Sequence, residues 1–388
     1  MHREMMKQIN KNIIYLGWVS FFTDMASSMV TTLLPIFVVY VLGEGVDKLG
    51  YIIAIATFAS YALRILFGYL SDRYQIVKPF VVSGYFISAV TKPLLMFSYS
   101  YTSVATLRAV ERMGKAVRSA SKDSLISQYS KKDKAGKSFG FHKMMDVAGE
   151  MSGALLIVAV FYFGTHDEAL IRDIFGWTLI PGLIATAIAL FFVKDTPKKK
   201  RKSKSVLYKE DYKLLWILGS YFSFFFFMMS EQYFIVKAKE MHFTLFEIPL
   251  LVVVSTLTQT LLSYYSGILT DKIGSRIMLF ISYLFGFFSL LSLKFGLVWL
   301  SFICLGMFTV ISINALRVYI SNEAISQAYV YGLMYGGIAI FSSLGALAIG
   351  QIWQHYGFDA VMLFSLSGIC VVSLLLLGGI VLNKVHIN

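Results

Sequence analysis

The sequence predicts an all-α membrane protein with twelve transmembrane helices in two six-helix bundles. Of its 388 residues, 57% are hydrophobic and only 15% are charged, whereas a soluble domain carries about 25% charge. Long apolar runs recur between short polar breaks, and each is close to the roughly 20 residues that cross a bilayer. A water-soluble globular protein is therefore excluded. The predicted spans are 13–42, 49–70, 80–99, 101–120, 138–163, 171–193, 213–236, 248–270, 277–294, 297–320, 329–353 and 358–382.

The first apolar run predicts a retained transmembrane helix. It follows the polar segment MHREMMKQINKN at residues 1–12 and is too long for the core of a signal peptide. No convincing small-residue cleavage site follows it. We therefore expect the run to stay in the protein as its first helix.

Charge placement predicts the orientation in the membrane. The net charge is +13, and most of the 35 Lys and Arg residues lie on one side of the predicted spans. Because positively charged short loops stay in the cytoplasm, we expect both termini to be cytoplasmic. The excess charge then reports orientation and attraction to anionic lipid headgroups, and a nucleic-acid partner is not expected. The predicted outer loops hold Lys48, Arg172, Lys237, Lys239 and Lys294.

A basic linker divides the predicted helices into two halves. The densest cluster of charge, KDTPKKKRKSK, begins at Lys194, between the sixth and seventh spans. We expect residues 1–193 to form the first six-helix bundle, 194–212 the cytoplasmic linker and 213–388 the second bundle. Two halves of equal helix number are typical of transporters built from parallel repeats, with a substrate site near the middle of the membrane.

A short loop signature occurs once in each half. GYLSDRYQIVK follows the second span, and GILTDKIGSR follows the eighth. Small glycines allow close helix packing at these ends, and an aspartate there is suited to a helix N-terminus or a basic side chain. The duplication supports an internal repeat. The alternative, that these are ordinary loop charges that set the membrane topology, stays open.

The second copy of this signature resembles the G-x-L-x-D-x-x-G-x-R/K loop motif of the major facilitator superfamily. The first copy matches less fully, because Gln75 stands where glycine is usual and Lys78 is the next basic residue. The resemblance implies a transporter fold over essentially the whole chain and an efflux-type bacterial member. It also implies that the matching residues latch one conformation: Gly68, Asp72, Arg73, Gly267, Asp271, Lys272, Gly274 and Arg276.

Acidic residues inside the predicted spans are the candidates for proton coupling. A charge in the bilayer costs several kcal/mol and persists where it is paired or lines a wet cavity. Carboxylates so placed can bind and release protons during a transport cycle. For Asp24, a fixed salt bridge to Arg64 or Lys92 is the equal alternative. The candidates are Asp24, Asp146, Glu150 and Glu231.

Basic residues in the spans are the candidates for substrate binding, namely Arg64, Lys92 and Arg108. Guanidinium and ammonium groups suit a carboxylate or phosphate on the cargo. Arg112, Lys115 and Arg118 are instead expected to form a gating network with Asp72 and Asp123. In the second half, Phe224–Phe227 and Met228–Met229 flank Glu231, and the stripe is either a packing surface or an amphiphile-binding surface.

The fifth span carries a ladder of exchangeable groups. His142, Asp146 and Glu150 are each four residues apart, so they share one helix face. We expect a proton relay or a salt-bridge network, with His142 and Asp146 as a weak metal-binding pair that lacks a third ligand. Gly149 and Gly153 are similar to the helix-5 motif of proton-driven antiporters in the superfamily, although Ala154 replaces the expected proline.

The function expected from the sequence is secondary transport. No ATP-binding or enzymatic motif occurs, so we expect no enzyme activity and no cofactor, with a proton gradient as the driving force. The leading hypothesis is proton-coupled export of a small organic molecule across the bacterial inner membrane, by a monomer. The alternatives are a symporter or exchanger of an anionic solute such as a polycarboxylate or siderophore, a metal-ion exporter, or a membrane receptor.

Overall fold

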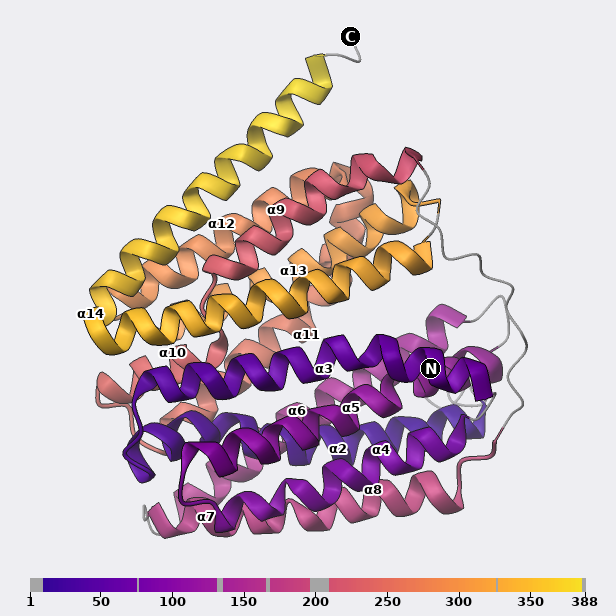
Figure 1. Cartoon of the computed structure of the whole chain (residues 1–388), viewed down its shortest axis with the longest axis vertical. Coiled ribbons are helices and arrows are strands. Elements are labelled where there is room, and N and C mark those ends of the chain that lie inside the picture. The colour runs from indigo at the N-terminus through magenta and orange to yellow at the C-terminus, as the bar shows by residue number, and fades with distance from the viewer. Residues whose placement is uncertain are drawn as a thin grey trace. The chain divides into compact units, whose positions relative to one another are not determined.

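The computed structural model describes residues 10–74, 77–130, 135–164, 168–195, 209–325 and 327–385, and all of its regular elements there are helical (Figure 1). Among the described residues, nine helices are long and apolar enough to cross a membrane, or ten if the bent pair Glu247–Ser263 and Tyr265–Ile273 is one span. This all-helical architecture confirms the predicted fold class, and it is consistent with the predicted twelve segments. The elements are α2 (Lys11–Ile36), η1 (Phe37–Val41), α3 (Val46–Tyr74), α4 (Lys78–Thr91), η2 (Pro93–Phe97), α5 (Tyr101–Tyr129), α6 (Ala135–Phe163), α7 (Glu168–Trp177), α8 (Leu179–Phe191), η4 (Lys209–Lys213), α9 (Leu214–Phe227), α10 (Glu231–Glu240), α11 (Glu247–Ile273), α12 (Ser275–Lys294), α13 (Val298–Glu323) and α14 (Gln327–Val385).

Some predicted segments differ from these elements in detail. The sixth is two helices, α7 and α8, separated at Thr178. The seventh breaks after Phe227, where Met228 is extended, and resumes at Glu231. The eleventh and twelfth segments are two helices, as predicted, which together carry the label α14 and meet at the non-helical Gly357, where φ is 81° (Figure 1). The fourth, α5, runs on to Tyr129 because its charged side chains still share a helical face.

Contacts divide the chain into two compact units. One consists of Met1–Phe37 and Ile55–Lys202, and the other of Val38–Ala54 and Ser203–Asn388. The predicted division at 194–212 differs from these units at 38–54. Most of that linker, 196–208, lies outside the described residues, so its flexible character stays a prediction.

In the first unit, α2 packs most extensively against α6, and glycines allow this contact. A Cβ atom at Gly149 would lie 2.2 Å from the carbonyl oxygen of Phe21, and one at Gly153 would lie 2.4 Å from that of Met25. Both distances are far below van der Waals contact. The two backbones therefore approach as closely as they do only because these positions lack side chains.

Glycines also allow α4 and α5 to pack closely. A Cβ atom at Gly84 would lie 2.6 Å from the carbonyl oxygen of Gly114, and one at Gly114 would lie 2.8 Å from that of Gly84. The cluster of buried side chains on the other side of α2 and α4 is apolar and includes Leu16, Val19, Val81 and Ala185. Close packing and this apolar cluster leave the polar faces of α2, α5 and α6 to line a cavity.

In the second unit, aromatic side chains fill the space beside α9. The ring of Phe224 stacks on Tyr283 with centroids 4.1 Å apart and lies 4.9 Å from Phe308. Phe224 and Met229 are buried, so this part of the predicted Phe and Met stripe is packing. The start of α3 also lies close to α14, at Gly50. Beside this glycine, the Tyr233 hydroxyl of α10 donates to the Ala346 carbonyl of α14 at 2.6 Å.

The close contact between α2 and α6 predicts that position 149 tolerates only glycine. Replacing Gly149 with alanine would force the two helices apart, because the added methyl group meets a backbone carbonyl that cannot rotate away. We expect the free energy of unfolding to fall by about 2 kcal/mol. The measurement is thermal unfolding of the purified protein in detergent.

The matched control is Gly140→Ala on the same helix, where an added Cβ would meet nothing within 4 Å. Alanine is the better helix former, so this variant should unfold at the wild-type temperature or slightly above it. Equal destabilisation by both substitutions would contradict the role given to Gly149.

Candidate functional site

A polar cavity of about 250 Å³ lies inside the first unit. All of its 16 lining residues are polar or charged. Six are Lys or Arg and three are Asp or Glu, so the lining carries an excess of positive charge. The lining residues are Ser20, Thr23, Asp24, Ser27, Ser28, Thr31, Arg64, Tyr85, Arg112, Lys115, Arg118, Ser119, Lys122, Lys143, Asp146 and Glu150.

One wall is formed by α2 through a stripe of small polar residues. Ser20, Asp24, Ser27 and Thr31 recur every three or four residues, which places them on one face of the helix. The Ser27 hydroxyl donates to the Thr23 carbonyl at 2.9 Å, and the Thr31 hydroxyl donates to the Ser27 carbonyl at 3.0 Å. Because these protons are used within the helix, the hydroxyl oxygens can accept hydrogen bonds from a solute.

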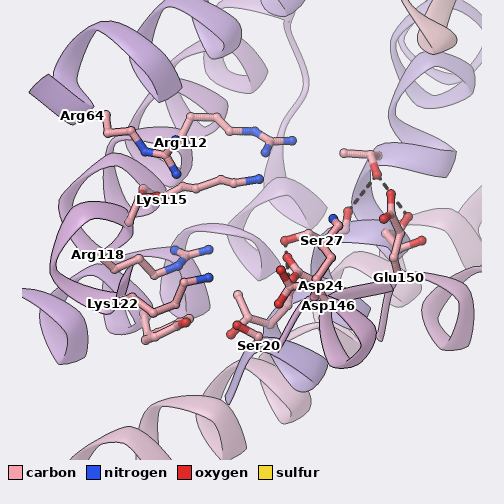
Figure 2. A pocket seen from close by; sticks show the side chains of 16 residues that line it. Ser20, Asp24, Ser27, Arg64, Arg112, Lys115, Arg118, Lys122, Asp146 and Glu150 are labelled. Atoms are coloured by element: carbon pink, nitrogen blue, oxygen red, sulfur yellow. Dashed lines mark hydrogen bonds between the residues drawn. The ribbon is translucent and has the colours of Figure 1, made fainter. Parts of the chain in front are cut away.

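The facing wall is basic and comes mainly from α5. Arg112, Lys115, Ser119 and Lys122 follow the same three-or-four spacing. Figure 2 shows the labelled side chains of α5, together with Arg64 from α3, extending toward Asp24, Asp146 and Glu150. The two walls therefore present mostly opposite charges to the same space.

Arg118 is held differently from the neighbouring lysines. Its Nη1 donates to the Ser88 hydroxyl at 2.6 Å and to the Gly84 carbonyl at 3.2 Å, both on α4. Its guanidinium group also lies over the Tyr85 ring, 4.5 Å from the centroid. These contacts fix Arg118 against α4, and they make it a positioning element of the cavity wall.

On the α6 wall, His142 lies between Ser20 and Asp146. The Ser20 hydroxyl lies 2.8 Å from His142 Nε2, and His142 Nδ1 lies 3.3 Å from Asp146 Oδ1. His142 is buried, whereas Ser20 and Asp146, which lie on either side of it, line the cavity. Among the described residues, no group of three or more His, Cys, Asp or Glu side chains is arranged to hold a metal ion.

The predicted substrate-binding residues are not all at this cavity. Arg64 lines it, but Lys92 and Arg108 are buried elsewhere. Lys92 Nζ donates to the Thr23 carbonyl at 3.3 Å. Arg108 Nη1 forms a 2.8 Å ion pair with Glu111 Oε2, which also lies 3.3 Å from Arg112 Nε.

Three of the four proton-coupling candidates meet at the cavity, namely Asp24, Asp146 and Glu150. Glu231 belongs to the second unit, where it is the first residue of α10 after the break in the seventh segment. The structure therefore brings together three of the four candidate acids within the first unit.

The predicted latch residues are described only in part. The side chains of Gly68, Asp72 and Arg73 lie outside the described residues. In the second copy, Gly274, where φ is 96°, is the single residue between the end of α11 and the start of α12. Arg276 contacts Tyr319, with Nη2 3.5 Å from the hydroxyl, and Asp271 and Lys272 are exposed near the end of α11. Their action as a latch stays a prediction.

Sequence reasoning did not assign Lys115 and Lys122 to substrate binding. The sequence predicts Lys115 in a gating network and assigns no role to Lys122, which lies beyond the fourth predicted span at 101–120. The signal that would have found them is the continued spacing Arg112, Lys115, Ser119, Lys122 beyond the apolar part of the segment.

Comparisons with known proteins identify the family. Residues 16–345 match the Major Facilitator Superfamily. An uncharacterized MFS-type transporter of Methanocaldococcus jannaschii is 30% identical over 372 residues, which cover 90% of each chain. The chain belongs to the major facilitator superfamily, and it is a transporter integral to a membrane.

Solved structures share the fold at low sequence identity. A variant of the nucleoside transporter NupG has a TM-score of 0.79 at 14% identity, covering 95% of this chain and 99% of that one. A POT family transporter in complex with a thioalcohol-conjugated peptide has a TM-score of 0.76 at 12% identity, with 98% and 99% covered. At this identity the likeness shows the fold alone.

The buried ion pair gives a test of what Arg108 does. Arg108→Met would leave Glu111 with Arg112 as its remaining partner, and breaking a buried pair costs about 3 kcal/mol or more. We expect a lower thermal unfolding temperature for this variant. In the double variant Arg108→Met/Glu111→Leu, much of the loss should be recovered, because no unpaired acid remains.

Unchanged stability in Arg108→Met would contradict the structural role. Equal destabilisation of the single and double variants would also contradict it. Such a result would show that the loss of stability comes from lost packing and not from the unpaired charge.

Proposed function

We propose that the protein is a secondary transporter of a small hydrophilic organic solute that carries a carboxylate or phosphate group. The proposal is supported above all by the cavity of the first unit, whose lining includes six basic and three acidic side chains and consists of polar or charged residues throughout. Binding of the solute at alternate sides of the membrane would follow the scheme common to this class of transporter.

The composition of the cavity favours an anionic group on the cargo. Lys115 and Lys122 donate up to three hydrogen bonds each, and Arg112 adds a planar fork suited to carboxylate or phosphate. An amphiphilic drug would need a largely apolar lining, whereas every residue that lines this cavity is polar or charged. The cavity therefore supports the anionic-solute alternative over a cargo of mainly apolar character.

The volume of the cavity limits the size of the cargo. At about 250 Å³ it is smaller than the roughly 300–1,000 Å³ of pockets that hold drug-sized ligands. A short polycarboxylate or a phosphorylated small acid suits this volume better than a siderophore. The structural relatives include a nucleoside transporter and a POT family transporter in complex with 5-aminolevulinic acid, so hydrophilic cargo is compatible with the fold.

Proton coupling is the second part of the proposal. Asp146 lies at the cavity and beside His142, so a proton can be accepted at a group that also faces the solute. Asp24 and Glu150 share the cavity, and protonation of any of the three acids changes the charge that a bound solute experiences. Export across the bacterial inner membrane, with both termini in the cytoplasm, stays our prediction from the sequence.

The first test removes one cation from the basic wall. In proteoliposomes, we expect counterflow of labelled succinate, citrate or glycerol 3-phosphate for at least one compound. Lys115→Met should reduce that counterflow about tenfold at low solute concentration, because a charge-assisted hydrogen bond is lost. Lys294→Met, an exposed lysine at the end of α12, is the control and should transport at the wild-type rate.

The second test separates proton coupling from solute movement. In Asp146→Asn, we expect uphill transport driven by a pH gradient to fall to the level measured without the gradient, because an amide does not take up the proton. Solute counterflow should persist. Asp173→Asn, an exposed acid on α7, is the matched control and should keep the response to the gradient. Full gradient-driven transport in Asp146→Asn would remove Asp146 from the coupling mechanism.

A further inference from the structure

Several charged residues of the cavity lack a direct partner. Among the described residues, Asp24, Glu150, Lys115, Lys122 and Lys143 form no ion pair within 4 Å. Two other charged residues of the lining have close partners, since Arg112 forms an ion pair with Glu111 and Asp146 lies 3.3 Å from the His142 ring. Each of these five side chains lines the cavity, so a group that enters the cavity can reach them.

The charged residues without an ion-pair partner are distributed by sign between the two walls, with one exception. Lys115 and Lys122 project from α5, whereas Asp24 projects from α2 and Glu150 from α6 (Figure 2). Lys143 is the exception, because it lies on α6 one turn before Asp146. The cavity lies between the α5 wall and the α2 and α6 wall (Figure 2).

A ligand that carries both signs can pair with the charges on both walls. Charges inside an apolar bundle are retained where they are paired or solvated. An anion alone would neutralise the lysines but would face the carboxylates of Asp24 and Glu150, and like charges repel at short range. A solute with an anionic end and a cationic end satisfies both walls at once.

We propose that the cargo is zwitterionic, with its carboxylate or phosphate group against Lys115 and Arg112 and its ammonium group against Asp24 and Glu150. This inference rests on the proposed function and specifies its substrate class.

The chemistry of the acidic wall fits a primary ammonium group. Such a group has three hydrogen-bond donors and no acceptor. The carboxylates of Asp24 and Glu150 supply charged acceptors, and the hydroxyl oxygens of Ser27 and Thr31 supply neutral ones on the same face of α2. The wall therefore offers several acceptors in the region where the positive end would lie.

The experiment compares compounds that differ only by an amino group. Binding of glutarate and glutamate, and of ethylphosphonate and 2-aminoethylphosphonate, is measured by calorimetry on the purified full-length protein at pH 7. We expect the amino compound to bind at least about tenfold more tightly in one or both pairs, because it gains charge-assisted hydrogen bonds.

Variants locate the preference at the acidic wall. In Asp24→Asn and in Asp24→Asn/Glu150→Gln, the ratio of affinities within the preferred pair should fall toward one, while the compound without the amino group binds at least as well as to the wild type. Asp173→Asn is the control and should keep the wild-type ratio. The single and double variants are both tested, and thermal unfolding confirms that each is folded.

The outcomes separate the two proposals. Equal binding within both pairs, or tighter binding of the compounds without an amino group, would overturn the zwitterionic cargo and leave the proposed function standing. An affinity ratio that survives in the folded double variant would also overturn it. Absence of binding by all four compounds, or binding that Lys115→Met does not weaken, would overturn the proposed function as well.

Discussion

The cost of placing charge inside an apolar helix bundle governs the organisation of the first unit. A charge in the bilayer costs several kcal/mol unless it is paired or hydrated, yet the spans of this unit contain acids and bases close to one another. The chain accommodates them in two ways. Arg108 and Glu111 form a fully buried ion pair. Most of the other charges face a shared polar cavity, where water or a solute can solvate them.

Helix packing decides which charges share the cavity. Glycines at Gly149 and Gly153 bring α6 against α2, so that Asp24, Asp146 and Glu150 lie on adjacent helices. Long basic side chains on α5 fill the opposite side. The second unit uses its space differently, because the rings of Phe224, Tyr283 and Phe308 pack against one another. Small residues and long charged residues together therefore create a polar cavity in one unit of an otherwise apolar protein.

Much of this organisation could be predicted from the sequence. Apolar run length gave the twelve segments, and the loop motif at Gly267–Arg276 gave the family. The site was harder to predict, because a buried charge in a helix is compatible with either a structural pair or a cavity. Arg108 and Arg112 are one helical turn apart, yet Arg108 is sealed against Glu111 and Arg112 reaches the cavity. Only the positions of neighbouring helices distinguish them. The break before Glu231 also left no clear signal in its apolar surroundings.

The most direct test of a water-filled, positively charged cavity needs no knowledge of the cargo. Ser27 is replaced by cysteine in a background where Cys304 and Cys370 are replaced by serine, and modification of the introduced thiol by anionic and cationic methanethiosulfonate reagents of similar size is timed. Excess positive charge on the lining should make the anionic reagent react about tenfold faster. The same preference should weaken when Lys115 is also replaced by methionine. No modification of the Ser27→Cys variant by either reagent, or faster reaction with the cationic one, would contradict the account.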